Sequence, residues 1–343
     1  MGRRGPKPGF NDVACPNEDC DLYGIAGRGN VIGNGTYNTK SGRVQKYICR
    51  TCGRVFCSRT NTAFYDLRTE EETILLALKL VLKGMSLRGI ADVLEVSAAT
   101  VSRWLSRAAD HSEEVNKKLL KDLNVSKVEL DEMWTIVKKK ELPELKEGED
   151  SGNWVWVGMD SETRLVLAHA VGERKQHMAD KVVGITKERI ASRPLFVTDG
   201  LKQYSKALLK HYGKLGLKYA QVIKHRQGRR LTKVVKKVIF GKGIDLWRIS
   251  TSLIERLNLT LRQDNNRVSR KTIGFSKKRE WLDKQMTFYF ANYNFCRGHG
   301  SLKYEDENGC CRKNSPAKEK DLIDRNWTLR ELLTHPYYIT STG

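Results

Sequence analysis

Three acidic residues, far apart in the chain, have the chemistry to bind divalent metal ions. Asp131 lies in an apolar, strand-like segment, Asp199 directly follows another, and Glu255 is on a predicted helix that begins near Ser252. Carboxylates are hard ligands for Mg²⁺ and Mn²⁺. Two such ions roughly 4 Å apart can activate the attacking oxygen and stabilise the leaving oxygen of a phosphodiester. As a set, the three acids predict metal-dependent chemistry on a nucleic-acid backbone.

The residue pattern leaves an alternative open for each of these acids. Glu132 is next to Asp131 in the chain. Because a strand sends adjacent side chains to opposite faces, we expect the two not to point at one site, and periodicity alone does not choose between them. Asp199 is equally well placed to cap the helix that follows it. Ser252 and Glu255 have the spacing of a capping box.

Two pairs of cysteines predict a second kind of metal site. Cys15 and Cys20 form one pair, and Cys49 and Cys52 form the other. Four thiolates complete a tetrahedral Zn²⁺ shell, and so short a Gly-rich segment has too little apolar area to fold without such a staple. The spacing predicts a structural zinc ribbon. Cys57 is close in sequence and is an alternative ligand in place of Cys52 or Cys20.

Residues 66–124 have the periodicity of a small helical domain. The stretch 84–94 followed by 96–105 has the rhythm of helix, short turn and helix, with Ser97 as the predicted N-cap of the second helix. Small and hydroxylic side chains at the start of a recognition helix suit the major groove of DNA. The side chains expected to face DNA are Ala98, Thr100, Ser102 and Arg103. A three-helix bundle that contacts no DNA is the alternative.

The charge of the chain indicates a polyanionic partner. Among 343 residues, 62 Lys+Arg stand against 40 Asp+Glu, a formal net charge of +22. The excess is concentrated in residues 214–248 and 256–279. The cations expected to bind phosphates beside the acids are Arg262, Arg267, Arg270 and Lys271. A solvated basic face is the alternative interpretation of these four.

The elements that must position the acids form an α/β layer structure. Apolar runs and periodicity predict strands at 128–137, 154–159, 165–171 and 195–198, and helices at 176–190 and 201–210. This order implies an α/β domain with a mixed sheet. The chain therefore divides into a zinc ribbon at 1–65, a helix-turn-helix domain at 66–124, an α/β domain at 125–265 and a basic, aromatic extension at 266–343.

Several of these segments together resemble a known family. They are Asp131–Trp134, Thr198–Gly200, Ile254–Asn258 and Arg270–Lys277. They look like those of the DDE transposases of prokaryotic insertion sequences, most closely the insertion-sequence-one type. The resemblance spans nearly the whole chain, because zinc ribbon, helix-turn-helix, RNase H-like catalytic domain and C-terminal extension occur in that order in such proteins.

The resemblance implies a catalytic site. In such proteins Asp131, Asp199 and Glu255 would be the triad that binds Mg²⁺, with Mn²⁺ as the usual substitute, and this chooses Asp131 over Glu132. The sequence departs from the family in the long basic segment between Asp199 and Glu255, which exceeds the spacing in many related enzymes.

The function expected on this basis is that of a transposase. It would bind the terminal inverted repeats of its element and catalyse DNA cleavage and strand transfer into target DNA. Its partners would be double-stranded DNA and, because two ends must meet, at least a second copy of the chain. One alternative is a zinc-ribbon and helix-turn-helix transcription regulator without catalysis. Another is a structure-specific nuclease of the same fold.

The composition places no segment in a membrane. The longest apolar run, Ile74–Leu82, contains Lys79 and is far shorter than the roughly 20 residues that cross a bilayer. Clustered cysteines of this kind are typical of metal sites in a reducing compartment, so we expect a cytoplasmic protein.

Overall fold

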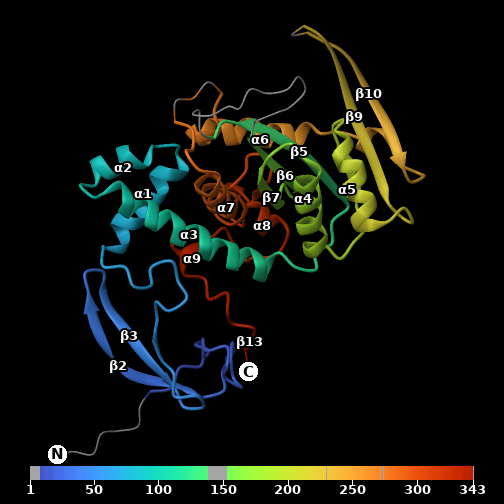
Figure 1. Cartoon of the computed structure of the whole chain (residues 1–343). Coiled ribbons are helices and arrows are strands. Elements are labelled where there is room, and N and C mark those ends of the chain that lie inside the picture. The colour runs from blue at the N-terminus through green and yellow to red at the C-terminus, as the bar shows by residue number, and fades with distance from the viewer. Residues whose placement is uncertain (1–7, 138–152, 229, 271, 273, 343) are drawn as a thin grey trace, which may run out of the picture.

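The structure, a computed structural model, describes residues 8–137, 153–228, 230–270, 272 and 274–342 (Figure 1). Lys271, one of the predicted phosphate-binding residues, lies outside the described residues.

A small antiparallel sheet forms the N-terminal module. Its strands are β2 (Val31–Thr39), β3 (Gly42–Cys49) and β4 (Val55–Cys57), preceded by the short β1 (Ile25–Ala26). Gly42 closes the turn between β2 and β3 with a φ of +105°, a conformation that residues with a Cβ rarely adopt. Among the described residues, the buried members of the apolar cluster beneath the sheet are Val31, Tyr47 and Phe56. Such a core is too small to hold the module without further cross-links.

Three helices follow, as the periodicity predicts. They are α1 (Glu71–Leu82), α2 (Leu87–Val93) and α3 (Ala98–Leu119). The predicted cap is confirmed, because the Ser97 side chain accepts a hydrogen bond from Thr100 N at 3.1 Å. Helix α3 extends beyond the predicted stretch because buried apolar residues continue along one face as far as Val115. Its later turns pack against a C-terminal helix, α7 (Arg279–Phe295).

A six-stranded mixed sheet forms the centre of the molecule. Its strands are β5 (Lys127–Thr135), β6 (Asn153–Asp160), β7 (Val166–Gly172), β8 (Leu195–Thr198), β9 (Lys218–Gln227) and β10 (Arg230–Phe240). The order across the sheet is β10-β9-β8-β5-β6-β7. Strands β5 to β7 form an antiparallel meander, β8 is parallel to both β5 and β9, and β10 returns antiparallel to β9.

Helices cover both faces of this sheet (Figure 1). On one face lie α4 (Gln176–Arg189) and α5 (Lys202–Tyr212), where Trp156 of β6 packs edge-on against Tyr204 of α5. On the other face lie α6 (Ser252–Asp264) and α7, which pack against Met133, Val155 and Val157 of β5 and β6. Side chains alternate between the two faces along β5 and β6, so each strand contributes apolar residues to the layers on both sides of the sheet.

The predicted strands of the meander agree with the structure to within about two residues, as boundary assignments normally do. The mixed sheet is also as expected. In contrast, the sequence pattern predicts no strands at β9 and β10. Most of β10 is exposed on both sides, so the segment has no apolar alternation to reveal it.

The C-terminal extension ties the modules together. The 3₁₀ turn η1 (Leu246–Arg248) precedes α6, and the 3₁₀ turn η2 (Asn266–Val268) follows it. The extension then contains α7, β11 (Lys303–Glu305), β12 (Cys311–Lys313), α8 (Pro316–Glu319), α9 (Leu329–Thr334) and β13 (Ser341–Thr342). Strand β13 pairs in parallel with β1 of the N-terminal module, and α9 packs against α3.

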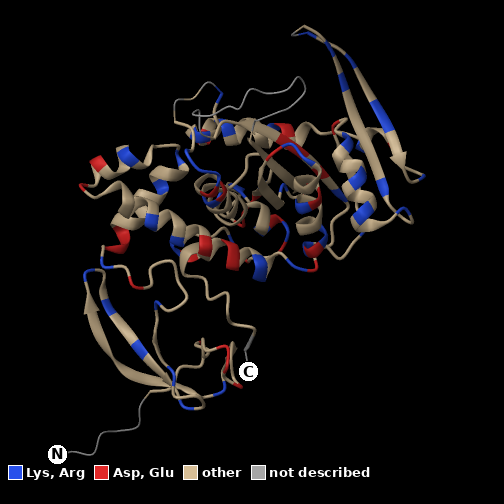
Figure 2. Ribbon diagram, in the orientation of Figure 1, with Lys and Arg blue, Asp and Glu red and all other residues tan. Residues whose placement is uncertain are grey.

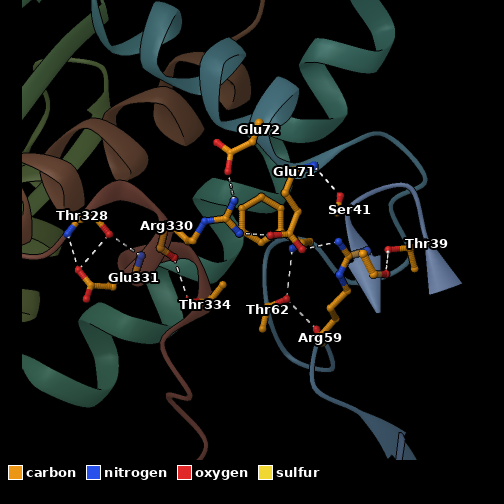
Figure 3. A network of polar contacts seen from close by, with 12 residues as sticks. Thr39, Ser41, Arg59, Thr62, Glu71, Glu72, Thr328, Arg330, Glu331 and Thr334 are labelled. Atoms are coloured by element: carbon orange, nitrogen blue, oxygen red, sulfur yellow. Dashed lines mark hydrogen bonds and ion pairs between the residues drawn. The ribbon is translucent and has the colours of Figure 1, made fainter. Parts of the chain in front are cut away.

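A polar network joins three of these parts (Figure 3). Glu71, at the start of α1, accepts hydrogen bonds from Arg59 of the N-terminal module and from Arg330 of α9. Arg330 also donates to Glu72 at 2.6 Å, and Glu71 N donates to Ser41 Oγ at 2.8 Å. One half-buried carboxylate thus links the first module, the helical domain and the C-terminal extension.

Among the described residues, no helix combines the length and the hydropathy that crossing a membrane requires.

Candidate functional site

The pairing of β5 and β8 brings Asp131 and Asp199 together. The two strands are parallel and paired as far as Leu130 and Thr198, so Asp131 and Asp199 are the first residues beyond the last pair. One ligand oxygen from each of Asp131, Glu132 and Asp199 lies within 4.8 Å of the others. The predicted capping role of Asp199 takes a different form, because α5 begins at Lys202 and Asp199 Oδ1 accepts from Leu201 N at 2.9 Å, just before the helix.

The expectation that Glu132 points away from a site shared with Asp131 is wrong. Asp199 follows the end of β8 rather than lying within the sheet, so carboxylates from both faces of β5 reach it. Glu132 Oε1 accepts from Arg174 Nη2 at 2.6 Å and from its Nε at 3.1 Å. Glu132 Oε2 is buried and has no hydrogen-bond partner within the described part of the chain.

The crowding of these acids changes their titration. Burial, followed by the charges of Glu132 and Asp199, raises the pKa of Asp131 to about 8. Burial and Asp199 raise the pKa of Glu132 to about 7, although Arg174 opposes the shift. The cluster is therefore unfavourable as three bare negative charges, and a divalent cation would relieve the repulsion. The residues fit a metal site.

Glu255 lies close to this cluster but is held by other groups. Its carboxylate accepts from Lys224 Nζ through both oxygens, and from Thr251 Oγ1 at 2.6 Å. The predicted capping box with Ser252 is not formed, because the N-cap of α6 is Thr251. Among the described residues, the close group of carboxylates does not include Glu255. The structure thus brings Asp131 and Asp199 together and leaves the third predicted acid in a separate ion pair.

A cavity of about 490 Å³ connects Glu255 with the cluster. Its wall is formed by β5, α6 and the loop after η2, and it contains Asp131, Glu132, Met133, Glu255, Asn258, Leu259, Arg262, Gln263, Ser269 and Arg270. Burial, followed by the charge of Arg270, lowers the pKa of Arg262 below its usual range. The cavity therefore combines carboxylates with guanidinium groups on one wall.

The predicted phosphate-binding residues have different surroundings. Arg262 and Arg270 line the cavity, and Arg270 is exposed. Arg267 is half-buried and donates to Ser276 Oγ at 2.9 Å, which ties two loop segments together. Arg262 and Arg270 are thus better placed for phosphate than Arg267.

Two residues that the sequence did not assign to the site help to position it. Glu129 is fully buried, pairs with Lys127 at 2.7 Å and accepts from Ile254 N at 2.9 Å, so it fixes the first turn of α6 to β5. Asn258 Nδ2 donates to Asp131 Oδ2 at 2.7 Å. The signal for Glu129 was present, because residues two apart on a strand share a face and Glu129 is two residues before Asp131.

The four predicted cysteines of the N-terminal module converge. Cys15 Sγ lies 3.6 Å from Cys52 Sγ, and Cys20 Sγ lies 3.9 Å from Cys49 Sγ. Zn–S bonds of about 2.3 Å in tetrahedral geometry place sulfurs about 3.8 Å apart, so the separations fit a zinc ion. Cys57 is not in this group within the described chain, and its sulfur instead accepts from Tyr37 Oη at 3.6 Å.

Hydrogen bonds to one of these sulfurs favour the thiolate form. Burial raises the pKa of Cys49. Hydrogen bonds from the Cys52 backbone and the Asn30 side chain outweigh burial and lower the pKa to about 6. A thiolate is the form that binds metal.

The four predicted DNA-facing residues begin helix α3. Arg103 is exposed, and Ala98, Thr100 and Ser102 are half-buried. Thr100 Oγ1 lies 2.9 Å from Ser97 Oγ, and Ser102 Oγ donates to Ala98 O at 2.9 Å. Both hydroxyls are thus used within the helix, which leaves Arg103 as the most accessible of the four.

Comparison with solved structures gives weak similarities to transposase complexes. Titles of three matches are "Crystal structure of the Mos1 Strand Transfer Complex", "Mos1 transposase paired-end complex with left transposon end" and "Crystal structure of a pre-cleavage Mos1 transpososome". Sequence identities are 14%, 15% and 10%, and TM-scores are 0.18, 0.18 and 0.21. The matches cover 41%, 41% and 65% of this chain and 55%, 56% and 75% of the others. This chain thus spans little more than half of the first two.

Comparison with protein families gives two matches. Residues 68–115 match the homeodomain-like domain HTH_23, which corresponds to α1 to α3. Residues 239–296 match the IS1 transposase family and include Glu255, Arg262 and Arg270. No curated protein matches the chain. Residues 239–296 are thus similar to the IS1 transposase family, and residues 68–115 are similar to a homeodomain-like helical domain.

Proposed function

We propose that this chain binds the terminal inverted repeats of an insertion sequence and catalyses metal-dependent DNA cleavage and strand transfer. The observation that supports this most strongly is the meeting of Asp131 and Asp199 where the parallel pairing of β5 with β8 ends, beside a cavity whose wall carries Glu255. The sheet order, an antiparallel meander extended by parallel strands, supports an RNase H-like catalytic domain.

In this proposal Asp131, Asp199 and Glu255 hold Mg²⁺ or Mn²⁺, and Glu132 is a further candidate ligand. When bound, the metal would activate the attacking oxygen and stabilise the leaving oxygen. The chain's own residues do the positioning. Asn258 orients the Asp131 carboxylate through its 2.7 Å hydrogen bond. Charge neutralisation and orientation are the main contributions a protein makes to phosphodiester chemistry.

DNA binding is assigned to several surfaces. The start of α3, with Arg103 exposed, would enter the major groove, and Arg262 and Arg270 would bind phosphates beside the scissile bond. The four converging cysteines would hold a structural Zn²⁺ in the N-terminal ribbon. The chain would act as a homodimer or larger assembly, because two element ends must meet.

The proposal keeps the four-part division of the chain. Residues 1–65 form the ribbon, 66–124 the helix-turn-helix domain, 125–265 the catalytic domain and 266–343 its extension. The end of α6 at Asp264 and the start of β5 at Lys127 support the limits of the catalytic part.

The experiment that tests the proposal uses Asp131→Asn, Asp199→Asn and Glu255→Gln. Each change removes a metal-ligating charge, so cleavage of duplex DNA that carries the element ends should fall by about 10²-fold or more in Mg²⁺. Binding of the same ends should persist, as measured by gel shift. Asp245→Asn, which changes an exposed acid, is the matched control and should cut normally. Full cutting by the three variants would exclude this catalytic site.

Two further assays separate the alternatives. A transcription regulator would bind the ends but show no difference between Mg²⁺ and EDTA in a cleavage assay. A structure-specific nuclease would cut in Mg²⁺ but would not join pre-cut ends to a target. The substrate can be taken from the DNA that flanks the gene, where the proposal requires short inverted repeats.

A further inference from the structure

Strands β9 and β10 continue beyond the sheet as a two-stranded ribbon, defined here as residues 222–228 and 230–240 (Figure 1). Strand β8 pairs with β9 only along Lys218–Gln221. From Val222 outward, β9 pairs with β10 alone among the described strands, and this pairing continues to Gln227 and Arg230. Most side chains beyond Ile223 are exposed on both faces. An isolated pair of strands is marginally stable in water, so the ribbon has a surface suited to a partner.

The charge of the ribbon indicates what kind of partner it binds. Residues 218–240 contain eight Lys/Arg and no Asp or Glu, and Figure 2 shows basic segments along both strands. Lys233, Lys236 and Lys237 lie within five residues of one another on β10. Like charges this close repel one another, and a polyanion removes the repulsion. A second copy of the same ribbon would increase the repulsion, so charge favours the backbone of DNA as the occupant.

One cation of the ribbon also contacts the candidate active site. Lys224 is opposite Val234, and the neighbouring pair on the same face is Val222 and Lys236. Lys236 Nζ donates to Leu246 O at 2.8 Å, so this face of the ribbon turns toward the segment that leads into α6. From here Lys224 binds both carboxylate oxygens of Glu255.

The ion pair competes with the role proposed for Glu255. Glu255 lines the same cavity as Asp131 and its charge raises the pKa of Asp131, so the two carboxylates are close. Both oxygens of Glu255 are nevertheless engaged by Lys224, and one of them also by Thr251. A phosphate is an alternative anion for Lys224, and it would leave Glu255 free to turn toward Asp131 and Asp199.

We propose that the ribbon binds the phosphates of double-stranded DNA and that Lys224 is a positioning residue, which holds Glu255 until DNA phosphate replaces it. The inference rests on the proposed function, because it assumes that Glu255 joins the metal-binding acids. It couples occupation of the ribbon to completion of the metal site, so the chain would assemble its third acid only on DNA.

The first test measures DNA binding by the ribbon in the full chain. The probe is a short fluorescent duplex of arbitrary sequence, and anisotropy is recorded over a series of salt concentrations. The variant Lys233→Met/Lys237→Met should lower the slope of log affinity against log salt by about 1 to 2, because each phosphate contact contributes about 0.9. The control Lys303→Met/Lys313→Met changes two exposed lysines on the separate β11–β12 hairpin and should leave the slope unchanged. An unchanged slope in the first variant, or an equal loss in both, overturns the ribbon as a DNA surface.

The second test measures Mn²⁺ affinity without DNA, by electron paramagnetic resonance of the free ion. If the ion pair holds Glu255 about nine-tenths of the time, Lys224→Met should bind Mn²⁺ about tenfold more tightly than the wild type. Lys224→Arg, which keeps the cation, should resemble the wild type. Adding Glu255→Gln to Lys224→Met should remove the gain. Unchanged Mn²⁺ affinity in Lys224→Met, or a gain that survives Glu255→Gln, overturns the positioning role.

The wild type provides a test that needs no substitution. The same duplex should tighten Mn²⁺ binding by the wild type and have little further effect on Lys224→Met. Asp131→Asn separates this inference from the proposed function. If Asp131→Asn binds Mn²⁺ normally, the metal site itself is wrong. If it loses Mn²⁺ while Lys224→Met behaves as the wild type, only the role of Lys224 is wrong.

Discussion

At the scale of single residues, the candidate site depends on contacts that the sequence pattern cannot specify. The sequence predicted that Asp131 and Asp199 belong to one site, and the parallel pairing of β5 with β8 brings them together. The participation of Glu132 could not be predicted, because alternation assigns it to the opposite face. The partner of Glu255 could not be predicted either, because Lys224 reaches it only through the pairing of β9 with β8.

Glu129 offers a prediction at this scale. Its carboxylate is fully buried and joins Lys127 to the first turn of α6, so Glu129→Gln leaves Lys127 without its anion. Breaking a buried ion pair by removing one partner lowers the free energy of unfolding by about 3 kcal/mol. Urea denaturation should show this loss. The exposed Glu280→Gln is the control and should stay within about 0.5 kcal/mol of the wild type.

At the scale of elements, the strands with alternating apolar residues were predicted, and the ribbon of β9 and β10 was not. Strands β5 to β8 are buried against helices, so their buried positions are occupied by apolar residues that can be recognised in the sequence. Among the described helices, none covers the ribbon beyond its base. Its residues are therefore rich in Lys and Arg and have no apolar periodicity. For the same reason, the sequence showed that the basic segment between Asp199 and Glu255 is unusually long but did not predict its two strands.

The link between α1, the N-terminal module and α9 gives a prediction for two neighbouring acids. Glu71→Gln should lower the free energy of unfolding by about 2–3 kcal/mol, because Arg59 and Arg330 both lose a half-buried anion. Glu72→Gln removes only an exposed partner, whose side chain is 78% accessible, and should change it by less than about 1 kcal/mol. Thermal unfolding of both variants provides the comparison, and equal effects would contradict the bridging role of Glu71.

The cysteine cluster gives a second prediction for an element. Because the N-terminal module has a small apolar core, removing Zn²⁺ with a chelator should unfold β2 to β4 while the central sheet remains. Hydrogen exchange would locate the loss. Cys49→Ser should bind less than one zinc per chain, whereas Cys57→Ser should bind one. A zinc content lowered by Cys57→Ser alone would restore Cys57 as a ligand.

At the scale of the whole molecule, buried histidines make the free energy of unfolding depend on pH. His111 of α3 lies 3.0 Å from Leu332 O of α9 through its Nε2, and it contacts the ring of Tyr337. Burial lowers the pKa of His111 to about 4, and His335 adds to the shift. A lowered folded-state pKa means that the unfolded chain binds the proton more readily as the pH falls.

Neutral His111 contributes about 3 kcal/mol to the free energy of unfolding. This contribution is fully present above pH 6.5 and is lost as the pH falls from 6.5 through 4. His111→Gln keeps a donor for Leu332 O but does not titrate. Its free energy of unfolding should therefore depend less on pH between 6.5 and 4 than that of the wild type. Urea titrations at several pH values measure this, and parallel curves for the two proteins would exclude His111 as the cause.

The pairing of β1 with β13 has a consequence for synthesis on the ribosome. Ala63 N donates to Leu333 O, and Thr340 N donates to Gly24 O, so a partner of the first module is translated 316 residues after Gly24. The helices of a nascent chain can fold early, yet β1 cannot pair with β13 until translation has passed Thr342. Chains terminated before β13 would therefore retain the helix-turn-helix but carry an undocked N-terminal module, and under the proposed function they would compete with the full chain for the same DNA.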